Sequence, residues 1–310
     1  MSESPLQLLL RFGLYADLIL LTGFLGWSAF GPARMQYIFR NTLPRAANFW
    51  LSGIGILLAI ATMLVSIGTM MGQPILELEA SSIDAILFGT GLGWAFVVRL
   101  IALTATVAAL LLPAIQASRL HVAALFAIVA LGSLAGSGHA AVTEGSLGAF
   151  HRLNDALHLL IAAIWIGAIV GFMLSAWKQG RSGRPDQLSE LADALRGFSP
   201  FGTVLVLLVA MTGLINLLLI TGWEALPELW RSQYGFLLGI KLALFAGMLV
   251  VAGLHRWLLA PALHSAIESE AKTGKALLAL RLSLAAEFLI SLLILAVVAW
   301  LGMTAPLTSA

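Results

Sequence analysis

Residues 200–222 of this chain read PFGTVLVLLVAMTGLINLLLITG, a run of apolar side chains without a charge. A helix of about 20 such residues crosses the hydrocarbon core of a bilayer. Seven similar runs accompany it, and lipid offers the backbone no hydrogen-bond partners, so the sequence predicts an all-α, polytopic membrane bundle of about eight transmembrane helices. The predicted spans are 7–30, 49–72, 86–112, 121–137, 152–177, 200–222, 235–259 and 282–304.

The composition indicates the same class of protein. Of the 310 residues, 60% are hydrophobic and 10% are charged, and the mean hydropathy is +0.98. Short connections containing residues such as Pro185 and Pro261 are predicted to end the helices. We therefore expect one transmembrane domain over residues 1–310. The opening segment lacks the pattern of a cleaved signal peptide, so we expect it to lead into a retained first span.

Charge and cysteine content restrict the chemistry. The net charge is only +2 and the basic residues are scattered, which favours the lipid bilayer rather than nucleic acid as a partner. The chain has no cysteine, so thiolate metal sites and thiol catalysis are excluded. A transition-metal site would have to use histidine, methionine, carboxylate or backbone groups.

The distribution of lysine and arginine predicts the orientation. With both termini outside, three basic residues lie in outside segments, namely Arg11, Arg152 and Arg231. Twelve then lie inside, namely Arg34, Arg40, Arg45, Arg119, Lys178, Arg181, Arg184, Arg196, Arg256, Lys272, Lys275 and Arg281. Because basic residues are concentrated in cytoplasmic loops, both termini are predicted to be periplasmic.

Two spaced motifs suggest an internal repeat. Gly93-x5-Arg99-Leu recurs as Gly235-x5-Lys241-Leu at an offset of 142 residues. A second pair recurs at an offset of 141, namely Asp17-x8-Gly26 and His158-x8-Gly167. A parallel duplication of a four-helix unit, with repeats over 7–137 and 152–304, would explain both offsets. Chance agreement is the alternative.

Polar residues gather around the start of the fifth predicted span. His151, Asp155 and His158 follow the spacing i, i+4, i+7, which places them on one helix face. Imidazole and carboxylate suit Cu(II) or Zn(II), and a nearby methionine would suit Cu(I). We predict a metal site formed by His139, His151, Asp155 and His158. The alternatives are that His139 and His151 are ordinary interfacial histidines and that Asp155 only orients an imidazole.

The distance between the two helical histidines raises a further question. Seven residues correspond to about 10.5 Å of helical rise, too far for both rings to bind one ion. A helix that begins at Asn154, a good N-cap residue, would let His151 fold back toward a shared ion. A helix unbroken from His151 predicts two neighbouring sites instead, an outer one formed by His151 with Asp155 and a deeper one at His158.

Other polar and sulfur-containing residues lie inside the predicted spans. Ionisable groups are costly in lipid and usually face a bundle interior or a cavity. Structural pairing of Asp17 with Arg99 or Lys241, snorkelling of the basic side chains, and simple packing of the methionines are the alternatives to a functional role. The candidate pathway residues are Asp17, Arg99, Met211, Lys241, Glu287 and Met303.

Three histidines remain on the predicted cytoplasmic side. His121, His255 and His264 are too far from the outer cluster to share its ion. They could be exit ligands or have no role.

Several motifs resemble those of the copper resistance protein D family, also written CopD or PcoD. They are GSGHAAVTEG over 136–145, H-x3-D-x2-H-x6-W-x-G over 151–167, Tyr234-Gly235-x5-Lys241-Leu, Arg256-x4-Pro261, and Glu287 in the last span. The resemblance covers 85–305 by motif and the first two spans by hydropathy. One departure is His255, where the family pattern leads us to expect asparagine.

The resemblance implies a non-enzymatic protein of the bacterial inner membrane that takes part in copper homeostasis and resistance. It implies a periplasmic copper-binding partner of the CopC type and movement of copper ions inward. It also places His139, His151, Asp155 and His158 at the outer site, with Lys241 and Glu287 as further matching positions. The residues alone leave two alternatives, a b-type haem redox protein and a copper chaperone that does not transport.

Overall fold

The computed structural model describes residues 5–112, 116–141, 143–182, 185–268 and 273–305, and these residues contain no strand. Among these described residues, eight helices are long and apolar enough to cross a membrane, which confirms the predicted polytopic all-α fold. These candidate spans are Pro5–Phe30, Ala46–Met71, Gly91–Leu111, Ser118–Gly136, Gly145–Lys178, Leu188–Thr221, Gln233–Ile267 and Gly274–Leu301. Of the basic residues counted above, Arg184 and Lys272 lie outside the described residues, and the side chains of Arg45 and Arg181 are also not described.

The helices follow one another with short connections. The α-helices are α1 (Pro5–Phe30), α2 (Ala33–Thr42), α3 (Arg45–Met71), α4 (Ala80–Gly89), α5 (Gly91–Leu111), α6 (Gln116–Gly132), α7 (Gly145–Ser182), α8 (Pro185–Thr221), α9 (Leu226–Leu229), α10 (Gln233–Leu254), α11 (Ala260–Glu268) and α12 (Gly274–Leu301). Short 3-10 turns are η1 (Ile75–Glu77), η2 (Ser133–Gly136) and η3 (His139–Ala141), and η4 (His255–Leu259) is a π-helical turn.

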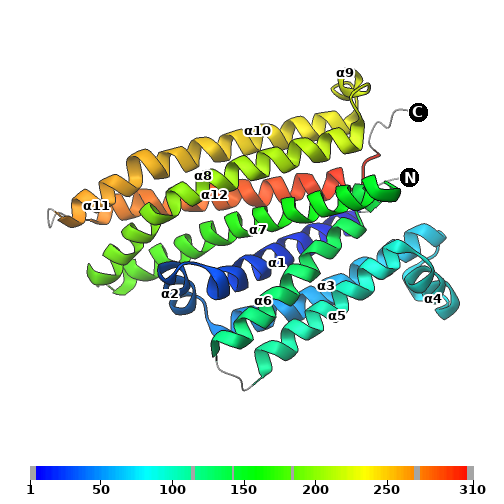
Figure 1. Cartoon of the computed structure of the whole chain (residues 1–310), viewed down its shortest axis with the longest axis horizontal. Helices are drawn as coiled ribbons and strands as arrows, with labels where there is room; N and C mark the ends of the chain where they lie inside the picture. The colour runs from blue at the N-terminus through cyan, green and yellow to red at the C-terminus, as the bar shows by residue number, and fades with distance from the viewer. Residues whose placement is uncertain (1–4, 113–115, 142, 183–184, 269–272, 306–310) are drawn as a thin grey trace.

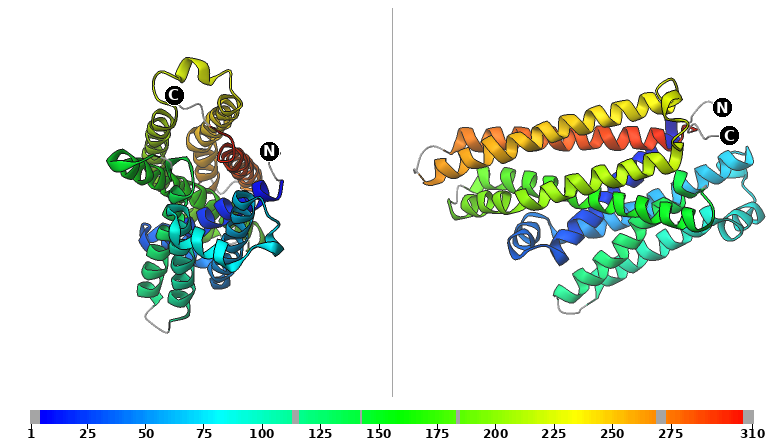
Figure 2. Two further views of the ribbon diagram at one scale, coloured as in Figure 1. Left: turned by 90° about the vertical axis from the view of Figure 1, so that its right-hand side faces the viewer. Right: turned by 45° about the horizontal axis from the view of Figure 1, so that its top comes forward.

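Helix α1 lies at the centre of the bundle. It packs against α3 and α6 on one side and against α7 and α12 on the other. Figure 1 shows α7, α8, α10 and α12 on one side of α1, and α3, α5 and α6 on the other. Both termini lie at the same end of the bundle, as an even number of spans requires (Figure 2).

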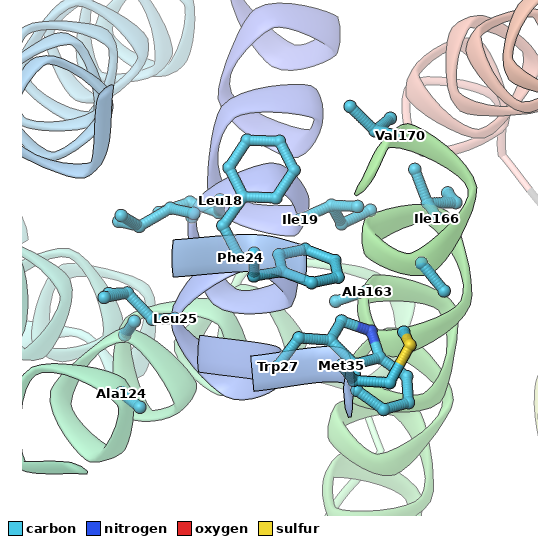
Figure 3. Close-up of a cluster of buried hydrophobic side chains, with 14 of the residues drawn as sticks. Leu18, Ile19, Phe24, Leu25, Trp27, Met35, Ala124, Ala163, Ile166 and Val170 are labelled. Carbon is cyan, nitrogen blue, oxygen red and sulfur yellow. The ribbon is translucent and has the colours of Figure 1, made fainter. Parts of the chain in front are cut away.

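The core forms where α1 meets α7. Figure 3 shows Leu18, Phe24 and Trp27 of α1 beside Ala163 and Ile166 of α7. Each of these side chains is buried, and the Trp27 Nε1–H donates to the Ile164 carbonyl at 2.8 Å. This direct hydrogen bond fixes the register of the two helices as well as their contact.

Two helices extend past a proline at which a predicted span began or was expected to end. Pro200 lies inside α8, and the chain stays helical through Pro261, which was wrongly predicted to end the seventh span. The π-helical turn η4 ends two residues before Pro261, and the Ala260 N–H donates to the His255 carbonyl five residues back. The wider turn gives the proline ring room beside the preceding carbonyls, so the helix continues.

The two halves share a local feature at the positions of the proposed repeat. The Gly93 N–H donates to Thr90 Oγ1 at 3.0 Å, and the Gly235 N–H donates to Ser232 Oγ at 3.0 Å. Each hydroxyl is the N-cap of its helix, α5 and α10. The caps agree with a duplication, which stays a prediction.

Candidate metal site

The predicted polar cluster shares one cavity. This cavity, called the outer cavity after the predicted orientation of the chain, has a volume of about 380 Å³ and is lined by residues of α1, α7, α8, α10, α12 and the η3 turn. His139, His151, Asp155, His158 and Lys241 all line it. The tertiary structure therefore brings the four predicted ligands and one predicted pathway residue to the same space.

His158 has one ring nitrogen held and the other available. Its Nδ1 lies 2.8 Å from Thr212 Oγ1, and the Thr212 hydroxyl donates its hydrogen to the Leu208 carbonyl at 2.7 Å. Thr212 Oγ1 must therefore accept from the His158 Nδ1–H, which leaves the lone pair on Nε2. Gly213 makes room for the ring, because a Cβ at that position would lie 3.2 Å from His158 Cε1.

His151 is buried on α7 rather than in a wet loop. Only 1% of the residue is exposed, and its Nδ1 lies 3.0 Å from Thr143 Oγ1. Its Nε2 is buried without a hydrogen-bond partner. An unpartnered imidazole nitrogen beside a cavity is a costly arrangement that a bound metal ion would relieve.

His139 enters the cavity from the turn before α7. Its Nε2 lies 3.0 Å from the Leu301 carbonyl, which can only accept, so Nε2 carries the hydrogen and Nδ1 the lone pair. Burial lowers the pKa of His139 below its usual value, the hydrogen bond to Leu301 opposes this shift, and the positive charge of Arg11 adds to it. The neutral, metal-binding form of His139 therefore persists to lower pH than in an exposed histidine.

Asp155 belongs to a polar network between α7 and α8. The Asn216 Nδ2 donates to Asp155 Oδ1 at 3.0 Å, and the Asn154 Nδ2 donates to Asn216 Oδ1 at 2.7 Å. Asp155 and Lys241 of α10 line the same cavity, and no ion pair joins them among the described residues. The carboxylate thus has a neutral donor and shares the cavity with a cation.

The structure decides between the two arrangements expected for the helical histidines. Helix α7 is unbroken from Gly145 to Ser182, and Asn154 bonds to α8 instead of capping a helix at its own position. The break required for one ion shared by His151 and His158 is therefore absent. In the described part of the chain, no three histidine or carboxylate side chains lie close enough together to form a closed metal site. The unbroken helix favours two neighbouring positions in one cavity.

The described part of the structure does not contain the pairing of Asp17 with a basic residue that was the alternative to a functional role. Among the described residues, Asp17 forms no ion pair with Arg99 or Lys241. Asp17 is buried with both carboxylate oxygens unpartnered, and a Cβ on Gly55 of α3 would lie 2.6 Å from its Oδ2. Arg99 instead donates to the hydroxyl of Ser133 at 3.0 Å, because α5 faces α6 and the η2 turn.

The methionines predicted for the pathway do not line the outer cavity. Met211 is 52% exposed on the surface of α8, and Met303 is half-buried. Met248 of α10 lines the cavity in their place and is buried. Sequence reasoning missed Met248, although it follows Lys241 by seven residues and therefore lies on the same helix face. It also assigned no role in the site to five polar residues of the cavity wall, namely Arg11, Tyr15, Asn216, Tyr234 and Ser291.

A second cavity of about 510 Å³ lies toward the other end of the bundle. Glu287 and His255 line this inner cavity, and His255 Nδ1 lies 2.9 Å from Glu287 Oε2. The Trp165 Nε1–H donates to Glu287 Oε1 at 3.3 Å. The Trp165 side chain lines both cavities and so stands between them.

Comparison with known proteins places the chain in a family. Residues 1–149 match the family described as copper resistance protein D-like, N-terminal domain, and residues 192–301 match copper resistance protein D. The chain is 33% identical over 312 residues to copper resistance protein D of Pseudomonas syringae pv. tomato, with 98% of each chain covered. This chain belongs to the copper resistance protein D family. The first two spans, which resembled the family only in hydropathy, belong to the matched region as well.

Two further known proteins are similar to the chain. It is 29% identical over 258 residues to inner membrane protein YebZ of Escherichia coli (strain K12), covering 81% of this chain and 83% of that one. It is 34% identical over 119 residues to copper transport protein CutJ of Bacillus subtilis (strain 168), covering 38% of this chain and 21% of that one. No solved structure matches the chain.

Proposed function

We propose that this protein moves copper ions inward across the bacterial inner membrane, without enzymatic activity. The observation that carries the proposal is the outer cavity, where His139, His151 and His158 each keep one ring nitrogen free of the hydrogen bonds described above. The names of the relatives support copper as the cargo. A periplasmic copper-binding protein of the CopC type is the donor that the family resemblance implies.

Within the cavity, copper would pass between two positions. His151 and Asp155, with His139 nearby, form the outer position, and His158 forms the deeper one. Lys241 lines the same wall and compensates the Asp155 charge when no metal is bound. Met248 and then Trp165 lie on the way to the inner cavity, so a soft thioether follows the imidazoles along the path.

Copper titration and flux test the function. Proteoliposomes that contain the parent protein and a copper(I) indicator should accumulate copper. With the double variant His151→Ala/His158→Ala, the initial rate of accumulation should be more than about tenfold lower. The two single variants should each lose part of the bound copper, with additive losses, because the sites are separate. His121→Ala, which lines neither cavity, is the control.

Other outcomes of these measurements would reject the proposal. Copper binding without flux in the parent would favour a copper chaperone. A Soret band, with sharp α and β bands on reduction, in the purified protein would favour b-type haem. If the single and double histidine variants all bind copper like the parent, the outer cavity is not the copper site.

The proposed direction depends on orientation, which a fusion experiment measures. A reporter joined after Ala310 should be active as alkaline phosphatase and dark as a cytoplasmic fluorescent protein, because basic residues are concentrated at the opposite end. The reverse result would place the outer cavity on the cytoplasmic side and reverse the proposed direction.

A further inference from the structure

The inner cavity contains a histidine prepared for metal binding. Glu287 is 3% exposed, and its carboxylate accepts from His255 Nδ1 at 2.9 Å. The Nδ1 therefore carries the hydrogen, and on the neutral ring the lone pair lies on Nε2. This Nε2 is buried and has no hydrogen-bond partner. A carboxylate that holds one ring nitrogen while the other is free is the usual support of a metal-bound histidine.

The local backbone sets the position of this ring. His255 is the first residue of the π-helical turn η4, which shifts the residues that follow relative to those of α10. Glu287 is fixed in turn by the Trp165 Nε1–H at 3.3 Å. The imidazole is thus oriented by two elements, α12 and α7, that are far from it in sequence.

The thioether of Met248 is a soft ligand on the same helix face as His255, toward the outer cavity. Met248 lies two helical turns before His255 on the same helix face, about 10.5 Å away along the axis. The Ser291 hydroxyl lies 3.5 Å from Met248 Sδ and donates to the Glu287 carbonyl at 2.9 Å. Met248 lines the outer cavity and His255 lines the inner one, so the two ligands stand on either side of the boundary at Trp165.

We propose that His255, oriented by Glu287, is the ligand of a second, inner copper(I) site. The inference rests on the proposed inward movement of copper, for which it supplies a release position. Since His255 is the one imidazole among the described residues lining the inner cavity, the ion keeps open coordination positions for an acceptor from the cytoplasmic side. Such a site binds weakly and exchanges its ion easily.

Two arginines also line the inner cavity. Arg196 and Arg256 are both exposed, so water and salt screen their repulsion of a cation. The buried Glu287 carboxylate lies against the imidazole and attracts a cation. The preference for copper(I) therefore rests on the ligands, since the next ligand along the helix is the soft thioether of Met248.

Equilibrium dialysis of the full chain in detergent against copper(I), under anaerobic reducing conditions, tests the inner site. His255→Asn should bind one equivalent less than the parent at saturation, because the amide can still donate to Glu287 but offers no imidazole. Glu287→Gln should keep the equivalent with an affinity about 10–100-fold lower. His264→Asn, which lines neither cavity, should bind like the parent.

A variant without the outer imidazoles separates this inference from the proposed function. The triple variant His139→Ala/His151→Ala/His158→Ala should retain one copper(I), and adding His255→Asn should remove it. Equal binding by parent and triple variant would reject the outer site while leaving the inner one. Parent-like binding by His255→Asn would overturn the inner site. If His255→Asn does not fold, parent-like affinity of Glu287→Gln would overturn it as well.

Discussion

Replacing Gly23 with leucine is expected to prevent folding of the bundle. A Cβ at this position would lie 2.4 Å from the Ala163 carbonyl oxygen and 2.9 Å from the Gly167 Cα. Both obstacles are backbone atoms of α7, so no side chain can rotate to make room. Helices in membranes approach closely where small residues meet, and α1 is the central helix of this fold. The destabilisation should exceed the roughly 1–3 kcal/mol typical of an overfilled core.

Thermal unfolding in detergent, followed by size-exclusion chromatography, measures this effect. Gly53→Leu in α3 is the matched control, because a Cβ there meets nothing within 4 Å. We expect little folded Gly23→Leu protein under conditions where Gly53→Leu is monodisperse. A Gly23→Leu protein as stable as the control would show that α1 and α7 do not cross at these glycines.

Replacing Lys241 with leucine is expected to destabilise the protein and to reduce copper flux. The change removes a positive charge that attracts the Asp155 carboxylate across the outer cavity. No ion pair joins Asp155 and Lys241 among the described residues, and Asn216 still donates to Asp155, so the loss of stability should stay below the roughly 3–5 kcal/mol of a broken buried ion pair. Copper flux should fall because the charge beside the histidines changes.

A double-mutant cycle separates stability from function. Asp155→Leu combined with Lys241→Leu should recover most of the stability lost in Lys241→Leu, because no unpaired charge remains. Flux should not recover, because Asp155 belongs to the proposed site. Lys275→Ala, an exposed change on α12, should alter neither quantity. Additive losses of stability in the double variant would show that Asp155 and Lys241 do not interact.

The candidate site could be predicted only in part. The spacing of His151, Asp155 and His158 placed these residues on one helix face, and the structure puts all three against one cavity. The sequence did not predict the unpartnered ring nitrogen of His255 or the contact between His255 and Glu287. These two residues are 32 positions apart and lie on different helices. Sequence spacing describes neighbours on one helix and cannot give the partner from another.

The methionines show that hydropathy does not predict which way a residue of a spanning helix faces. Met211 and Met248 have equal hydropathy and both lie inside spans, yet one faces outward on α8 and the other lines a cavity. In a membrane, a lipid-facing surface and a protein-facing surface are equally apolar, so hydropathy does not report the rotation of a helix about its axis.

The sequence by itself determined the eight spans and the residues that share a helix face. Apolar runs of membrane length have one stable backbone solution in lipid, and the helical period fixes which side chains are neighbours along it. Only the tertiary structure decided that α7 stays unbroken past Asn154, that Asp17 faces Gly55 rather than Arg99, and that two cavities meet at Trp165. These features depend on which helices approach each other and how closely. Contacts such as Gly23 against Gly167 set that approach, and they form between residues far apart in the chain.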